Sequence, residues 1–204
     1  MKEISCYISE KLTISKSSKQ TRYSCQPKTK GELKQILKER LSKDKDADLN
    51  DIDVSLIEDM SYLFYGLNPH NIDISEWDVS NVKNMECMFD HCNKFNSDLS
   101  QWNVSSVILM SHMFNGCWLF NSDLSQWDVS NVTDMRSMFF NCPSFNQDLS
   151  QWDVSNVEDM NGIFFNCDNF NSDLSCWDVS NVQNMGSMFY GCSSLKTKPN
   201  WYRE

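Results

Sequence analysis

The chain has 204 residues, of which 40% are hydrophobic, and it carries a formal net charge of −10. This hydrophobic content is typical of a folded protein and argues against an intrinsically disordered chain. No stretch approaches the roughly 18 consecutive apolar residues of a membrane helix, so we expect no membrane span.

The first twenty residues, MKEISCYISEKLTISKSSKQ, contain no apolar run of the roughly 7–15 residues that a secretory signal needs. The chain as written is therefore expected to be cytoplasmic, or to lie at the cell surface or be secreted if a signal was removed from it. Residues 1–51 carry a net charge of +4, and residues 52–204 carry −14. An acidic segment repels phosphate backbones, so we expect no nucleic-acid partner.

The segment PKTKGELKQILKERLSK predicts one helix near residues 30–43. Thr29 is a candidate N-cap, and Leu33, Ile36 and Leu37 form an apolar side. We assign residues 1–51 to an N-terminal cap that contains this helix.

A repeat of 25 residues follows the cap, and tryptophan gives its register at Trp77, Trp102, Trp127, Trp152 and Trp177. The unit from Trp127 reads WDVSNVTDMRSMFFNCPSFNQDLSQ. The first unit is degenerate, with Ile52 in place of tryptophan, and the last one decays after Leu195. Degenerate ends are expected of terminal coils, which meet solvent on one side. We therefore predict about six coils over residues 52–201 and a short tail at 202–204.

Within one unit, the apolar residues Val132, Met135, Met138, Phe139 and Cys142 have the spacing of one side of a short helix. The alternation of Trp152, Asp153 and Val154 predicts a very short strand. The predicted fold is an α/β solenoid of the leucine-rich-repeat type, right-handed, with one short strand and one short helix per coil. Like residues of neighbouring coils would stack and bury one another.

The recurring Trp-Asp-Val-Ser-Asn-Val, Met-x-x-Met-Phe-x-x-Cys and Phe-Asn-x-Asp-Leu-Ser resemble the bacterial surface-protein repeat of about 25 residues, a domain of unknown function found in mycoplasmas and gut-associated bacteria. The Phe-x-x-Cys core also resembles the BspA-like leucine-rich repeat. The resemblance covers about 150 residues. It implies a leucine-rich-repeat-like solenoid and, as in some members, surface adhesion, and it implies no reaction.

Five cysteines also recur every 25 residues, at Cys92, Cys117, Cys142, Cys167 and Cys192. No C-x-x-C pair or histidine cluster accompanies them, so we expect no metal site. The side chains of the five cysteines are expected to point in parallel, so they cannot all pair in disulfides. We therefore expect buried, reduced thiols, which favour a reducing compartment.

Two rows of aspartates recur as well. Asp78, Asp128, Asp153 and Asp178 lie on the predicted strand and are expected to face outward. They are candidates for gathering Ca2+, which prefers several oxygen ligands, or for accepting hydrogen bonds from turn amides. For the second row, which includes Asp73 and Asp173, we expect the turn role.

Positions that differ between units are not required for stacking, so they are candidates for a binding surface. The residue after the Met-Phe pair is aromatic in four of the six units, and Trp118, Leu119 and Ile108 also replace polar residues of other units. A row of exposed apolar residues favours a contact surface, although such side chains also pack by leaning over the next coil. The candidate partner-binding residues are Trp118, Leu119, Phe140, Phe165, Tyr190 and Ile108.

No catalytic constellation is visible. The three histidines lie at different repeat positions, and no Ser/His/Asp grouping or phosphate-binding glycine loop occurs. We therefore expect no enzyme activity and no cofactor. The leading functional prediction is a protein-interaction or scaffolding module with a protein partner. The alternatives are a cell-surface adhesin for a host protein or glycan and, more weakly, a cation-binding aspartate array. The sequence leaves the oligomeric state open.

Overall fold

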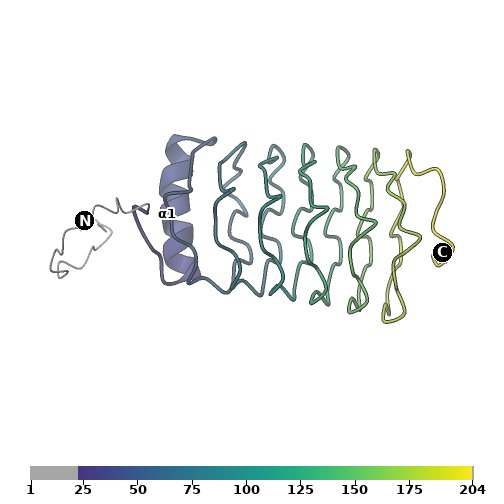
Figure 1. Cartoon of the computed structure of the whole chain (residues 1–204). Helices are drawn as coiled ribbons and strands as arrows, with labels where there is room; N and C mark the ends of the chain where they lie inside the picture. The colour runs from purple at the N-terminus through teal and green to yellow at the C-terminus, as the bar shows by residue number, and fades with distance from the viewer. Residues whose placement is uncertain (1–22, 204) are drawn as a thin grey trace.

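The computed structural model describes residues 23–203, which begin with a cap helix and continue as a row of coils stacked side by side (Figure 1). Helix α1, Lys30–Lys43, confirms the predicted cap helix. The Thr29 side chain accepts a hydrogen bond from the backbone N–H of Glu32, which caps the first turn. The buried side of α1 consists of Leu33, Leu37 and Leu41. Residues 1–22 of the predicted cap and the last residue of the predicted tail lie outside the described part.

The predicted α/β coil, with one strand and one helix, is wrong. Among residues 23–203, α1 is the single α-helix, and the coils are joined only by isolated parallel bridges such as Asp134↔Asp159. The predicted helix over residues 132–142 fails because Ser137 and Asn141 have left-handed φ values of 52° and 54°. From Asp59 onward the bridges between coils lie in that segment, at the position of Asp134, and not at Trp152–Val154, so the leucine-rich-repeat assignment fails with the helix.

Each coil is instead a succession of tight turns, closed by hydrogen bonds from a backbone N–H to the carbonyl oxygen three residues earlier. The residues at both ends of such a turn point inward and are buried, as for Met135 and Met138. Apolar residues three apart therefore arise from repeated turns, and this spacing imitates the periodicity of a helix. Turns of this kind end at Val132, Met138, Cys142, Phe145 and Trp152.

Along residues 135–141 and the equivalent segments, the backbone hydrogen bonds between coils share one direction, whereas those one or two residues earlier, such as Thr133 N–H to Ile108 O, run the other way. In a regular strand, N–H and C=O groups alternate along an edge. Here the left-handed residues turn successive peptide groups the same way, so that alternate N–H groups of one coil all donate to carbonyls of the next. In one junction these donors are Met135, Ser137, Phe139 and Asn141, and their acceptors are Asp159, Asn161, Ile163 and Phe165, at 2.8–3.0 Å.

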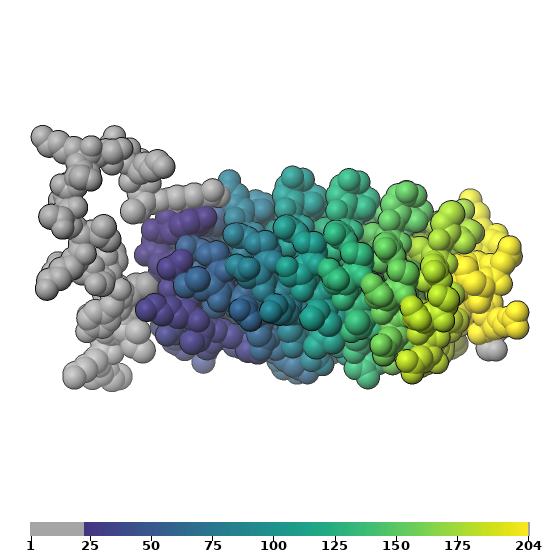
Figure 2. All heavy atoms as spheres, turned by 60° about the horizontal axis from the view of Figure 1, so that its bottom comes forward, coloured from purple at the N-terminus to yellow at the C-terminus, as the bar shows by residue number. Residues whose placement is uncertain are grey.

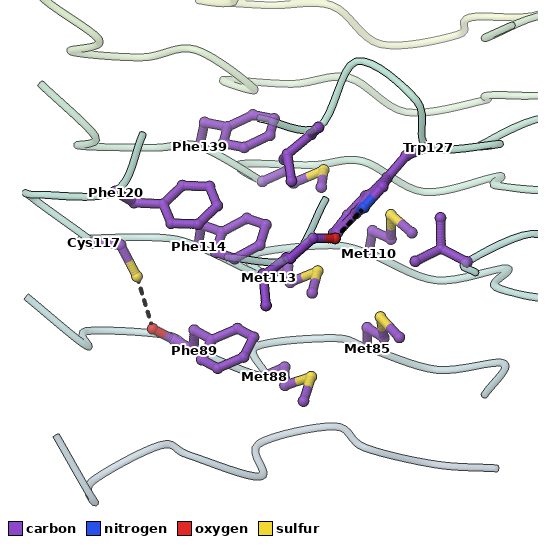
Figure 3. Packing of buried hydrophobic residues seen from close by; sticks show 14 of the residues in the cluster. Met85, Met88, Phe89, Met110, Met113, Phe114, Cys117, Phe120, Trp127 and Phe139 are labelled. Atoms are coloured by element: carbon purple, nitrogen blue, oxygen red, sulfur yellow. Dashed lines mark hydrogen bonds between the residues drawn. The ribbon is translucent and has the colours of Figure 1, made fainter. Parts of the chain in front are cut away.

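The core is a set of ladders that run the length of the stack. Phe89, Phe114 and Phe139 follow one another with ring centroids 5.6 Å apart in both steps (Figure 3). The indole Nε1 of Trp127 donates to the Leu99 carbonyl oxygen at 3.0 Å. No buried side-chain nitrogen or oxygen of the described residues lacks a hydrogen-bond partner. Stacking therefore buries large apolar area without leaving polar side-chain atoms unsatisfied.

The outer surface follows the same order, with side chains of each coil beside those of the next along an elongated body (Figure 2). Any surface made by one position of the repeat is consequently a row parallel to the long axis. Within residues 23–203, no helix has the length and apolar character needed to cross a membrane.

Candidate interaction surface

Three of the predicted contact residues form an aromatic row on the outside of the last coils. The rings of Phe140 and Phe165 stack with centroids 4.4 Å apart, and those of Phe165 and Tyr190 with centroids 4.8 Å apart. Phe140 and Phe165 are partly buried, whereas Tyr190 is 66% exposed. Gly162 lies beside the row and has a positive φ of 62°, like the equivalent Ser137 and Ser187 of neighbouring coils. These aromatic residues both pack across neighbouring coils and leave apolar surface at the end of the row.

Trp118 and Leu119 lie at a turn between the buried residues Cys117 and Phe120. Their side chains are 55% and 54% exposed, although both are large and apolar. The equivalent residues one coil earlier are Asn93 and Lys94, so the coil does not need apolar side chains at these positions. Apart from Tyr190, these two residues are the most exposed large apolar side chains among residues 23–203.

Ile108 is 42% exposed and lies on another segment of the same coil. Its backbone N–H donates to the Lys83 carbonyl oxygen, and its own carbonyl accepts from the Thr133 N–H. The next three coils carry Thr133, Glu158 and Gln183 at this position, and these line an open polar groove with Asn131, Asn156 and Asn181. Ile108 is therefore an isolated apolar side chain in a polar row, apart from the aromatic row.

The four aspartates predicted on a strand face are exposed, but they lie in turns. In each case Oδ1 accepts the backbone N–H of the serine two residues later, as in the 3.1 Å bond from Ser130 to Asp128. Hydrogen bonds from Ser155 hold the pKa of Asp153 below its ordinary value. Among the described residues, no group of three or more His, Cys, Asp or Glu side chains has an arrangement that would hold a metal ion. The predicted strand location of Asp78, Asp128, Asp153 and Asp178 is thus corrected to a turn.

The cysteine ladder is an internal part of the core. Cys92, Cys117, Cys142 and Cys167 are buried, Cys192 is partly buried, and no cysteine of the described residues forms a disulfide. Each thiol donates to the carbonyl of a phenylalanine one coil earlier, as in the 3.0 Å contact from Cys117 Sγ to the Phe89 oxygen (Figure 3). Burial raises the pKa of Cys92 to about 12. The predicted burial is confirmed for Cys92, Cys117, Cys142 and Cys167, and Cys192 is buried only in part.

The sequence analysis predicted the cap helix but not the contacts that it makes with the first coil. At the first coil, Lys30 Nζ of α1 lies 2.6 Å from Asp59 Oδ2 and 2.7 Å from Ser61 Oγ, and Lys34 Nζ donates to the Tyr62 carbonyl oxygen. Within residues 23–203, no helix covers the backbone of the last coil. The sequence did contain one signal for the left-handed backbone of the coils. Glycine recurs at equivalent positions, at Gly66, Gly116 and Gly191, and all three have positive φ. Recurrent glycine at one position indicates a left-handed residue, which is incompatible with a helix.

The repeat is matched twice by one family model, described as "Mycoplasma protein of unknown function, DUF285", over residues 32–129 and 108–203. No curated protein matches the chain, and no solved structure does either. The two matches together span most of α1 and all of the coils. The chain therefore belongs to the family described as Mycoplasma protein of unknown function, DUF285.

Proposed function

We propose that the stack of coils is a protein-interaction or scaffolding module, whose contact surface combines Trp118 and Leu119 with the aromatic row of Phe140, Phe165 and Tyr190. The observation that carries this proposal is the exposure of Trp118 and Leu119, each more than half accessible. Large aromatic side chains of this kind dominate the energetics of protein interfaces.

The repeat itself supplies the comparison that supports a contact role. Equivalent positions in other coils hold polar residues: Asn93 corresponds to Trp118, Lys94 to Leu119 and Asn115 to Phe140. Those coils have the same backbone hydrogen bonds to their neighbours. The apolar residues are therefore dispensable for stacking, while burying one of them against a partner contributes roughly 1.5–3 kcal/mol.

The experiment compares the unmodified chain with a variant changed on this surface and a control variant changed outside it. The contact variant carries Trp118→Asn, Leu119→Lys, Phe140→Asn and Phe165→Asn, all residues that the repeat already uses at these positions. The control variant carries Gln126→Glu, which introduces the residue that Glu76 has at the equivalent exposed position. Both baits and the unmodified chain are used in quantitative pull-downs from lysate of the source cell, and their urea unfolding midpoints establish that they fold.

A protein retained by the unmodified chain and by Gln126→Glu, but lost by a folded contact variant, would support the module and its surface. The captured protein is then purified, and its dissociation constant for each bait is measured directly. Equal binding by all three baits would refute this surface.

A further inference from the structure

The polar groove contains three exposed asparagines whose side chains are held by the preceding coil. The Nδ2 atoms of Asn131, Asn156 and Asn181 donate to serine carbonyl oxygens of that coil, at 2.8, 2.7 and 2.6 Å. Within residues 23–203, none of the three Oδ1 atoms accepts a hydrogen bond. Each asparagine therefore keeps one carbonyl oxygen and one N–H for a ligand. Because the side chains are already ordered, binding costs little conformational entropy.

The opposite wall of the polar groove consists of Thr133, Glu158 and Gln183, one from each of the same three coils. The backbone N–H of Glu158 donates to the Thr133 carbonyl oxygen, and that of Gln183 to the Glu158 carbonyl oxygen, both at 2.8 Å. The side chains of Glu158 and Gln183 are exposed and have no hydrogen-bond partner within residues 23–203. Both walls thus present polar groups that are free to bind.

The polar groove has the size of a site for a small molecule. Its volume is about 420 Å³, and such sites usually have roughly 300–1,000 Å³. All of its lining residues are polar, so it offers no apolar wall to a hydrophobic ligand. Amide side chains both donate and accept hydrogen bonds, as hydroxyl groups do. This lining therefore suits a ligand that carries many hydroxyl groups.

The coils before the polar groove show where it ends. In the preceding coil, Ser106 and Ile108 take the two wall positions, and Ile108 has no polar group in its side chain. One coil earlier the wall positions belong to Asn81 and Lys83, and Asn81 donates to the Ser55 carbonyl oxygen at 2.9 Å. The combination of an asparagine with an opposite polar, uncharged or acidic residue therefore occurs in three successive coils.

The spacing of the coils selects among extended ligands. Hydrogen-bonded parallel segments lie about 4.8 Å apart, so equivalent groups of the polar groove recur at about this interval. Two residues of an extended peptide span about 6.7 Å, so its repeating groups would fall out of step with the coils. One β-linked hexopyranose residue is close in length to the coil spacing. Successive sugars of a straight oligosaccharide would therefore meet equivalent pairs of wall residues.

Charge narrows the ligand further. Asp128, Asp153 and Asp178 each lie three residues before an asparagine of the polar groove, and Glu158 belongs to its wall. These carboxylates repel phosphate, sulfate and uronate groups. A polyamine carries only donors, so it would leave the free N–H groups of the asparagines without acceptors. A neutral ligand with hydroxyl groups satisfies both the donors and the acceptors.

We propose that the polar groove binds a neutral, straight, β-linked oligosaccharide, with one sugar residue at each of the three coils. The free oxygen and N–H of each asparagine pair with neighbouring hydroxyl groups, and Glu158 accepts from a hydroxyl of the middle sugar. The polar groove contains neither Trp118 nor Leu119 nor the aromatic row. Failure of this site would therefore leave the proposed protein-interaction surface untouched, and the reverse also holds.

The test titrates the full chain, by calorimetry, with three neutral tetrasaccharides that have straight β-(1→4) linkages: cellotetraose, mannotetraose and chitotetraose. Maltotetraose, whose α-linkages make it curved, is the comparison. We expect at least one of the three β-linked ligands to bind, and maltotetraose to bind at least about tenfold more weakly, because its sugars leave the register of the coils. Absence of binding by all three at millimolar ligand would overturn the proposal.

Two matched variants locate the site. The groove variant carries Asn156→Ser and Glu158→Ile, the residues that the coil before the polar groove has at these positions. The control variant carries Asn81→Ser and Lys83→Ile, which makes the same replacements outside the polar groove and also removes an asparagine bond to the preceding coil. Urea unfolding midpoints establish that both fold. We expect the groove variant to weaken binding at least about tenfold, because it removes hydrogen-bonding groups, and the control to leave it unchanged.

Amide NMR spectra of the unmodified chain identify the contacting groups without any substitution. The ligand is expected to shift the side-chain amide signals of Asn131, Asn156 and Asn181 and to leave that of Asn81 in place. Binding that the groove variant retains would overturn the proposal. So would a ligand that shifts the indole signal of Trp118 in place of the three asparagine signals.

Discussion

The two ends of the stack meet solvent in different ways. The first coil is covered by α1, whose Leu33, Leu37 and Leu41 are at most 1% exposed, and whose lysines reach polar oxygens of that coil. The last coil keeps partly exposed Val182 and Met185. The two coils have turns in common, so a main difference between the ends is that α1 covers the first coil.

The two ends also differ because the backbone hydrogen bonds give the stack a direction along its long axis. Along residues 135–141 and the equivalent segments, alternate N–H groups donate to the next coil. The carbonyl groups that accept these bonds therefore face the first end of the stack, and the N–H groups face the last end. Ammonium groups suit the first end and anions the second. A single type of cap therefore does not suit both ends.

The largest expected difference is in cysteine labelling. Cys92 is fully buried and Cys192 is only partly buried, and burial raises the pKa of their thiols to about 12 and about 11. In a short iodoacetamide pulse at pH 8, we expect Cys192 to be labelled roughly a hundredfold or more faster than Cys92, because reaching Cys92 requires opening several coils. Mass spectrometry of peptides measures both rates, with exposed Cys176 as the reference. Equal rates at Cys92 and Cys192 would contradict the difference between the ends.

Alanine substitutions compare the same ends in stability. Leu37→Ala removes a fully buried side chain between α1 and the first coils, and we expect a loss of about 2–4 kcal/mol in the free energy of unfolding. Val182→Ala lies at the partly exposed end, and we expect a loss below about 1 kcal/mol. Urea unfolding followed by tryptophan fluorescence gives both values. A cost at Val182 equal to that at Leu37 would show that the C-terminal end is as well packed as the cap.

The smallest expected effect concerns the ion pair that holds α1. Arg40 forms two hydrogen bonds with Asp51, of 2.9 and 2.8 Å, and these hold the pKa of Asp51 below its ordinary value. Both side chains are more than a third exposed, so the pair contributes below about 1 kcal/mol. The contribution is present above the unfolded-state pKa of about 3.9 and is lost as the pH falls through the lower folded-state pKa.

Arg40→Gln is therefore expected to reduce stability at pH 7, and its difference from the unmodified chain is expected to disappear as the pH falls through the lowered folded-state pKa of Asp51. Unfolding free energies measured across the acid range give the comparison, with Lys38→Gln on the exposed side of α1 as the control. A stability difference that persists unchanged into acid would assign the effect of Arg40 to packing.

The sequence predicted the register of the coils, the cap helix and the burial of the cysteine ladder, because each depends on which residues recur or on local capping. It did not predict the backbone of the coil. The spacing of Met135, Met138 and Cys142 is produced equally by a helix and by successive three-residue turns, and apolar periodicity alone does not distinguish them. The left-handed φ values of Ser137 and Asn141 exclude the helix, and a serine in the sequence does not predict such a φ value.

The candidate surface was predictable for a different reason. Trp118 and Leu119 depart from the consensus of the repeat, and departures toward apolar residues at outward positions are visible without a structure. The sequence did not predict the stacking of Phe140 on Phe165 or the common direction of the N–H groups along residues 135–141, because both depend on which residues lie side by side in space.

The indole hydrogen bond between coils has a consequence for how such a chain changes in length over evolution. Trp102, Trp127, Trp152 and Trp177 each donate to a carbonyl 28 residues earlier, and Trp201 donates to one 27 residues earlier, so the bond allows a change of only about one residue in the length of a coil. Insertion or loss of a few residues would separate the donor from its acceptor and displace the phenylalanine and cysteine ladders as well. Duplication or deletion of one whole coil leaves all of these partners in place. We therefore expect relatives of this chain to differ in length by whole coils.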